Sequence, residues 1–445
     1  MVYLVNKISQ TTYEIFQKYK KGIIIVVIVC FIILCIIFLQ SILFFVERSI
    51  NIAANYYRRP GGIIYLISIP ILIILPIIYA LLYIKGFETT SIQILEKIKL
   101  RYLLPLHAVI SFFALWRGGD KWVGADLPVY FSIVNSIAQD LDLIIWSIFN
   151  NPNGLNLYLI GEPVAFFLLA GIVALGFPVH FISVVSIMFS VANLSIIYKI
   201  LHERFEEATA TIGALIYIFS PVILKFEADL IKNLFAITFG LLAFYFWGKK
   251  AILTSIFLSL CVATHIVTAS LFFLLLLNLA REERCLKKFV IVIAVVFLLL
   301  LPFWLIIDPY TIYYISIGRF QILVSQGTFL EYDPNRRGFF PHWPDALIFP
   351  TIRIFISIGL FLVYYVLNYQ NIPKRHWSMW IIVTIVLVIL GYIFPLLHPE
   401  RWAYYLGFAL MFLIAPSLKL ENKSLFMVFL IGCYIAFAAH LLVAY

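Results

Sequence analysis

Side chains that could perform chemistry are concentrated in a few polar segments between long apolar stretches. Two of these segments are long, at residues 117–177 and 307–349, and the first contains Asp126 after a glycine-rich approach. A second acidic segment runs from Glu227 to Asp229. A partly buried carboxylate has a raised pKa and can accept a proton from a reacting hydroxyl group. We therefore predict a site in which Asp126 is the general base and Asp229 is a second catalytic carboxylate.

Cations near the later polar segments could bind an anionic group. Arg401 is the predicted phosphate ligand, because a guanidinium binds phosphate bidentately and does not lose its charge. An arginine at this depth would alternatively contact lipid headgroups. The other residues predicted to bind substrate are His265, Lys232, Arg319, Arg337, Trp343, His398 and Glu400.

The three acidic residues could also bind a metal ion. Carboxylates from Asp126, Glu227 and Asp229, together with a substrate phosphate, would suit Mg²⁺ or Mn²⁺. The alternative is structural, because Asp126 and Asp229 each stand where an N-cap is expected, before Pro128 and before an apolar run that starts at Leu230. The sequence leaves both interpretations open.

Long apolar elements must position these residues. The chain of 445 residues is 64% hydrophobic and 12% charged, whereas soluble domains have about 45–50% apolar and about 25% charged residues. A helix needs about 20 apolar residues to cross a bilayer. We predict an all-α polytopic membrane protein with about 13 transmembrane helices. The predicted spans are residues 22–46, 62–84, 101–116, 178–201, 208–224, 230–247, two short spans within 251–280, 289–306, 350–367, 377–397, 402–418 and 425–445.

Charge sets the predicted orientation. With the N-terminus in the cytoplasm, 20 of the 32 Lys and Arg residues fall on inside loops, and all eight Asp residues fall outside. Residues 251–280 must then turn back near His265, because a single span would move the basic segment 281–288 outside. The net charge of +10 is explained by membrane orientation, so it does not imply a nucleic-acid partner.

The first outside segment contains two further apolar stretches, residues 132–149 and 157–176. The first has apolar residues at helical spacing opposite polar ones, which is typical of a helix lying in the membrane interface. If the second crossed the membrane, Asp126 and Asp229 would lie on opposite faces. We predict that both are juxtamembrane helices, and that the site faces outward.

The order and sidedness of these motifs resemble those of the GT-C membrane glycosyltransferases, near the protein mannosyltransferase and aminoarabinose transferase branch. The matching features are Asp126 before Pro128, the acidic segment 227–233, the pair Thr264-His265 and the motif at 398–401. The resemblance covers residues 101–416, so residues 1–100 are predicted to be an added helix pair and 101–445 the catalytic module. A Trp-Trp-Asp motif, found in oligosaccharide-transferring members, is missing from the sequence.

This resemblance implies transfer of a single sugar from a polyprenyl-phosphate carrier to a glycan, lipid or protein acceptor at the extracytoplasmic face of the plasma membrane. Membrane lipids are the other expected partners. The main alternative is a transporter or lipid-linked sugar flippase, although such proteins commonly contain an internal repeat that is not evident here. A structural subunit with a degenerate site is a third interpretation.

Overall fold

The structure is a computed structural model, and it is helical throughout the part of the chain that it describes. It describes residues 98–116, 122, 127–139, 163–306, 354, 358–366, 377–393, 399–418, 429 and 431–435. The helices are α3 (Leu100–Leu115), α4 (Leu127–Gln139), α7 (Pro163–Ala174), α8 (Phe181–Arg204), α9 (Glu207–Ile218), α10 (Pro221–Ala228), α11 (Ile231–Phe246), α12 (Ala251–Thr264), α13 (Ile266–Glu282), α14 (Leu286–Ile306), α18 (Ser378–Ile393) and α19 (Pro399–Leu418). The prediction of an all-α chain is confirmed for these residues.

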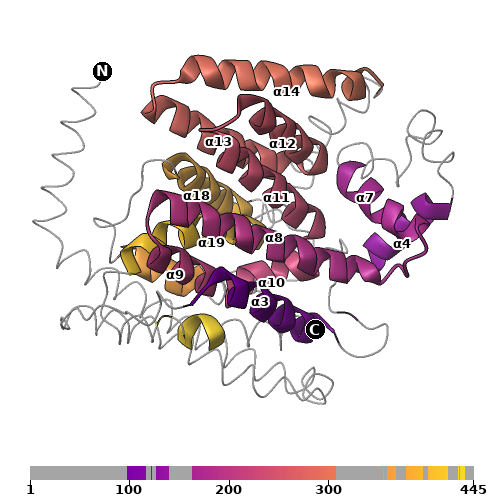
Figure 1. The fold of residues 1–445 in the computed structure, drawn as a ribbon, viewed down its shortest axis with the longest axis horizontal. Helices are drawn as coiled ribbons and strands as arrows, with labels where there is room; N and C mark the ends of the chain where they lie inside the picture. Colours follow the sequence, from indigo (N-terminus) through magenta and orange to yellow (C-terminus); the bar gives the residue numbers. More distant parts are fainter. Residues whose placement is uncertain are drawn as a thin grey trace, which may run out of the picture.

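Helix α11 lies at the centre of the bundle. It packs against α8 on one side and α12 on the other (Figure 1). Four consecutive residues of α11, from Leu234 to Ile237, are at most 1% exposed. A helix that is apolar and covered on all sides belongs in a protein interior. In Figure 1, α14 lies beyond α12 and α13 at one end of the described helices, while α4 and α7 form a pair at the side of the bundle.

The apolar runs form helices of different lengths. Among the described helices, α8 is long and apolar enough to cross a membrane, and the bent pair α9–α10 is a second candidate. Helices α3, α11 and α12 are apolar but shorter. The count of about 13 spans stays a prediction, because the predicted spans 22–46 and 62–84, and most of 425–445, lie outside the described residues.

The predicted span over residues 208–224 is interrupted in the structure, as a broken span or a re-entrant segment. The chain forms two helices there, α9 and α10, and they are bent by 55° at the break. Pro221 is the first residue of α10, and Ser220 before it has extended backbone angles. Proline lacks an N–H donor and disfavours helical geometry in the preceding residue, so the break falls at this point. The short helix α10 therefore has its own direction.

The predicted turn at His265 is confirmed. Helix α12 ends at Thr264, α13 begins at Ile266, and His265 between them has an extended backbone. The far ends of the two helices also meet, because Trp247 before α12 donates a hydrogen bond of 3.0 Å to Glu283 after α13. The two short helices thus form a hairpin.

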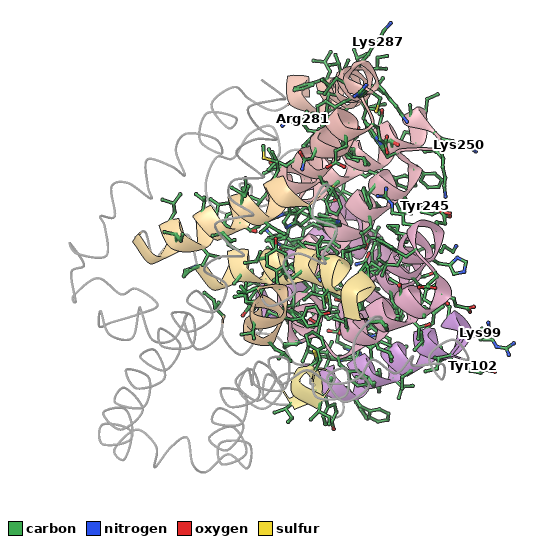
Figure 2. The ribbon with its side chains drawn as sticks, turned by 90° about the vertical axis from the view of Figure 1, so that its left-hand side faces the viewer. Lys99, Tyr102, Tyr245, Lys250, Arg281 and Lys287 are labelled. Atoms are coloured by element: carbon green, nitrogen blue, oxygen red, sulfur yellow. The ribbon has the colours of Figure 1, made fainter. Side chains whose placement is uncertain are left out.

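Basic residues gather where several helix ends meet. Lys99 before α3 forms a 2.8 Å ion pair with Glu207 at the start of α9. Lys249 after α11 forms a 2.7 Å ion pair with Glu203 near the end of α8. Figure 2 shows Lys99 and Lys250 along the same edge of the described helices. We call the surface that carries Lys99, Lys249 and Lys250 the basic face. These residues are predicted to be cytoplasmic.

A close helix approach brings the start of α19 against α18. A Cβ atom added at Gly391 of α18 would lie 2.8 Å from the Cα of Pro399, the first residue of α19. No side chain fits at that separation, so glycine permits this contact. The contact holds the N-terminal end of α19, which carries Arg401, next to the bundle.

Candidate functional site

The structure describes part of the predicted site. Glu227, Asp229, Lys232, His265 and Arg401 belong to the described residues. Glu400 lies in α19, but its side chain is not described. The other predicted site residues lie outside the described part of the chain: Asp126, Arg319, Arg337, Trp343 and His398.

Helix α10 carries the second acidic segment, and its two carboxylates have different partners. Glu227 accepts a 3.0 Å hydrogen bond from the Ser111 hydroxyl and lies 3.1 Å from the Nε2 atom of His107. Asp229, the C-cap residue of α10, forms an ion pair with Lys225 one turn earlier. Side chains two positions apart on a helix do not face each other, which explains why the two carboxylates are engaged separately.

The contacts of Glu227 extend into a network that joins α3, α8, α9 and α10. The Nε2 atom of His107 lies 2.8 Å from the Ser190 hydroxyl, which lies 3.0 Å from the Tyr217 hydroxyl. Every member is at most 1% exposed. We call this set the buried charge network: His107, Ser111, Ser190, Tyr217 and Glu227. Because an unpaired polar group is costly in an apolar interior, the network fixes the position of α10.

The helix that follows Asp126 contacts the helix that follows the second acidic segment. Leu127 and Tyr130 of α4 share a buried apolar cluster with Ile231, the first residue of α11. The backbone N–H of Lys232 also donates a 3.5 Å hydrogen bond to the Tyr130 hydroxyl. Asp126 is the residue immediately before α4 in the sequence. Both acidic segments therefore lead into helices whose N-terminal ends touch.

His265 caps α13 and takes part in a second polar cluster. Its Nδ1 atom accepts a 3.2 Å hydrogen bond from the backbone N–H of Thr268. The Thr268 hydroxyl contacts the Tyr405 hydroxyl, which accepts a 2.7 Å hydrogen bond from the side-chain amide of Asn233. We call Asn233, His265, Thr268 and Tyr405 the tyrosine cluster. A substrate contact by His265 stays a prediction.

The tyrosine cluster contacts α10, which carries Glu227, and shares helix α19 with Arg401. Phe226, the neighbour of Glu227 on α10, packs against Tyr405 with ring centroids 5.5 Å apart. Arg401 precedes Tyr405 by four residues on α19, so the two side chains lie on the same side of that helix. The Arg401 side chain is exposed, whereas Tyr405 is buried. Arg401 is therefore placed one helical turn outside the cluster.

The Oδ1 atom of the Asn233 side-chain amide is buried and has no hydrogen-bond partner among the described residues. Asn233 is 6% exposed and lies in the first turn of α11. Buried polar atoms are normally paired, so this group has hydrogen-bonding capacity that the described residues do not use.

The described carboxylates do not suit a divalent metal as they stand. Glu227 is engaged by His107 and Ser111, and Asp229 is paired with the Lys225 ammonium group. Within the described residues, no three His, Cys, Asp or Glu side chains are grouped as metal ligands. Hard cations need several oxygen ligands that do not already hold a cationic partner. The metal at Asp126, Glu227 and Asp229 stays a prediction.

Sequence reasoning missed most of the partners of these residues. His107, Ser190, Tyr217 and Thr268 lie in apolar helices and show no local motif. A usable signal existed for His107, because an ionisable residue inside an apolar span is a functional candidate by default. A second signal existed for Tyr405, which the i, i+4 rule places beside Arg401.

The chain was also compared with known proteins. The sequence model described as the EpsG family matches residues 106–445. No curated protein matches the chain, and no solved structure matches it. Because the family match spans well over half of the chain, the protein belongs to the EpsG family, whose members are membrane-associated and glycosyltransferase-like or polymerase-like.

Proposed function

We propose that this EpsG-family protein is a GT-C-type glycosyltransferase that moves a single sugar from a polyprenyl-phosphate carrier to an acceptor. The acceptor is a glycan, a lipid or a protein, and transfer takes place at the extracytoplasmic face of the plasma membrane. The N-terminus is cytoplasmic in this proposal. Family membership supports the transferase class, and the motifs at residues 124–130, 227–233 and 398–401 support the GT-C type.

The contact between α4 and α11 is the observation that carries the proposal. It brings the segment after Asp126 to the segment after Asp229, although Tyr130 and Lys232 are 102 positions apart. Both segments lie at helix ends remote from the ion pairs of the basic face, because α11 runs from Ile231 to Phe246, beside Lys249. A site at this end agrees with an outward-facing reaction.

The proposed reaction is a displacement at the anomeric carbon. The acceptor hydroxyl oxygen forms a bond to that carbon, and the bond from carbon to the phosphate oxygen breaks. Its electron pair leaves with the polyprenyl phosphate, and Asp126 takes the hydroxyl proton. The Arg401 guanidinium neutralises the departing phosphate through paired hydrogen bonds. The Oδ1 atom of Asn233 would accept a hydrogen bond from a sugar hydroxyl.

The Lys225–Asp229 pair would act as one unit that points the Lys225 ammonium at the donor phosphate. The Lys225 side chain is 18% exposed and that of Asp229 is 3% exposed. We expect Asp229→Asn and Lys225→Gln each to lower kcat/KM for the lipid donor about tenfold, which corresponds to about 1.4 kcal/mol of transition-state stabilisation. The double variant should be no worse than either single one, because residues that act together are not additive. Steady-state kinetics in nanodiscs measure this.

If the loss of kcat/KM in the double variant equals the product of the two single losses, Lys225 and Asp229 act independently. That result would contradict the paired arrangement. A matched control is Glu203→Gln with Lys249→Gln, which removes an ion pair from the basic face. That control should leave kcat/KM unchanged. If EDTA inactivates the wild type but does not affect the remaining activity of Asp229→Asn, the residue is a metal ligand instead.

The donor class can be tested directly with purified protein in liposomes. We expect turnover of radiolabelled polyprenyl-monophosphate sugars, seen as label released from the lipid fraction or moved to an acceptor. Turnover restricted to oligosaccharides on a polyprenyl diphosphate would replace the single-sugar proposal with a polymerase. Movement of intact donor across the bilayer, without cleavage, would identify a flippase. Binding of donor without either process would indicate a subunit with a degenerate site.

A further inference from the structure

A cavity of about 630 Å³ lies on the basic face, at the end of the bundle remote from the proposed transfer site. Its walls come from the start of α3, the end of α8, the start of α9 and the end of α11. Cavities that hold small molecules commonly measure about 300–1,000 Å³. The cavity is large enough to hold an organic headgroup, and the proposed glycosyl transfer does not use it.

Positive charge exceeds negative charge around this cavity. Its lining includes three cations and two carboxylates: Lys99, Arg101, Lys199, Glu203 and Glu207. Each carboxylate is already paired, Glu207 with Lys99 and Glu203 with Lys249. The hydrogen bond to Glu207 raises the pKa of Lys99 above its ordinary value, so this lysine stays protonated at neutral pH.

Two cations therefore remain for a ligand. Arg101 lies over the Tyr102 ring and donates to its hydroxyl, and it has no carboxylate partner among the described residues. Lys199 has no ion pair within the described part of the chain, and both side chains are exposed. Figure 2 shows Lys99, Tyr102 and Tyr245 along one edge of the molecule, where this cavity is formed. Arg101 and Lys199 both belong to the lining of this cavity.

The remaining lining suits an amphiphilic ligand. Leu100, Tyr198 and Tyr245 supply apolar surface next to the charged groups. Helix α3 begins at the cavity, its N-cap side chain accepts no hydrogen bond from the first turn, and its first turn has no acidic residue, whereas α9 begins with Glu206 and Glu207. The partial positive end of α3 adds to the field of the basic side chains. Phosphate groups are attracted to this combination.

We propose that this cavity binds the phosphate headgroup of an anionic membrane lipid on the cytoplasmic face, with Arg101 and Lys199 as its ligands. Basic residues at a membrane surface each contribute about 1 kcal/mol to binding of anionic lipid. A cavity with apolar walls beside two exposed cations adds selectivity for a lipid over a soluble anion. The site is separate from the transfer site and does not depend on its chemistry.

Native mass spectrometry of the full-length protein tests the proposal, with phosphatidylglycerol and phosphatidylcholine as probes. The wild type should bind phosphatidylglycerol in preference to phosphatidylcholine. In Arg101→Gln/Lys199→Gln the Kd for phosphatidylglycerol should rise about 30-fold, because two contacts of about 1 kcal/mol are lost. The matched control is Lys250→Gln/Lys287→Gln, which removes the same charge from exposed residues outside the cavity lining. Its Kd should change less than about twofold.

Equal losses in the two double variants would overturn the proposal, since binding would then reflect general surface charge. Equal binding of the two lipids by the wild type would also overturn it. A third arm adds inorganic phosphate and pyrophosphate as competitors. Displacement of phosphatidylglycerol by millimolar phosphate would show that the cavity is a site for soluble phosphate, and would refute a lipid site. Folding of each variant is checked by its monodisperse elution.

Discussion

Replacing Asp126 with asparagine should lower glycosyl transfer by about 10²–10⁴-fold, the range typical of losing a general base. Asparagine has nearly the same shape as aspartate, but it cannot take the proton of the acceptor hydroxyl. Donor binding should be retained, because the phosphate is assigned to Arg401. Single-turnover rates with a radiolabelled polyprenyl-phosphate sugar measure the chemical step, and filter binding measures the donor Kd.

Asp120→Asn is the matched control for this experiment. Asp120 lies six residues earlier in the same polar segment, so this change removes an equal charge. Its turnover should equal that of the wild type. Full activity of Asp126→Asn would make the base assignment wrong, and equal losses in both variants would point to the charge of the segment as a whole. Inactivation of the wild type by EDTA would support the metal prediction.

Much of the fold could be predicted because it follows from charge and hydropathy along the chain. The hairpin at His265 was predictable because basic residues flank residues 251–280 on both sides, which requires an even number of crossings. The break between α9 and α10 was not predicted, since residues 208–224 are predominantly apolar and contain no charged residue. Pro221 was the relevant signal, because proline favours the first turn of a new helix.

The candidate site could be predicted only in part, for a different physical reason. The acidic segment at 227–229 was identifiable because charged residues are rare in this chain. The pairing of Glu227 with Ser111 was not, since Ser111 is 116 positions away and is an ordinary polar residue within an apolar helix. Likewise, the contact of Asn233 with Tyr405 spans 172 positions. Such pairs depend on how helices pack, and local patterns carry no information about them.

The largest loss of stability should follow from removing one side of the buried charge network. Glu227→Ala would leave His107 and Ser111 without their carboxylate partner at sites that are 1% exposed. Breaking a buried pair in this way is expected to lower the free energy of unfolding by about 3–5 kcal/mol. The measurement is the thermal midpoint of the detergent-solubilised protein, followed by fluorescence-detected gel filtration.

A compensated variant distinguishes lost partners from lost packing. His107→Leu combined with Glu227→Met replaces the pair with apolar groups of similar size, and such replacements are often neutral. The thermal midpoint of the double variant should therefore be well above that of Glu227→Ala, although the double variant carries two substitutions. Glu203→Gln is the exposed comparison, where loss of the ion pair with Lys249 should cost at most about 1 kcal/mol. If Glu227→Ala has the same thermal midpoint as Glu203→Gln, the buried charge network does not hold α10 in place. If the compensated variant is stable but inactive, the buried charge network serves the transfer site as well as the fold. Helix α10, with its Lys225–Asp229 pair, is the only described element that belongs to both the network and the transfer site.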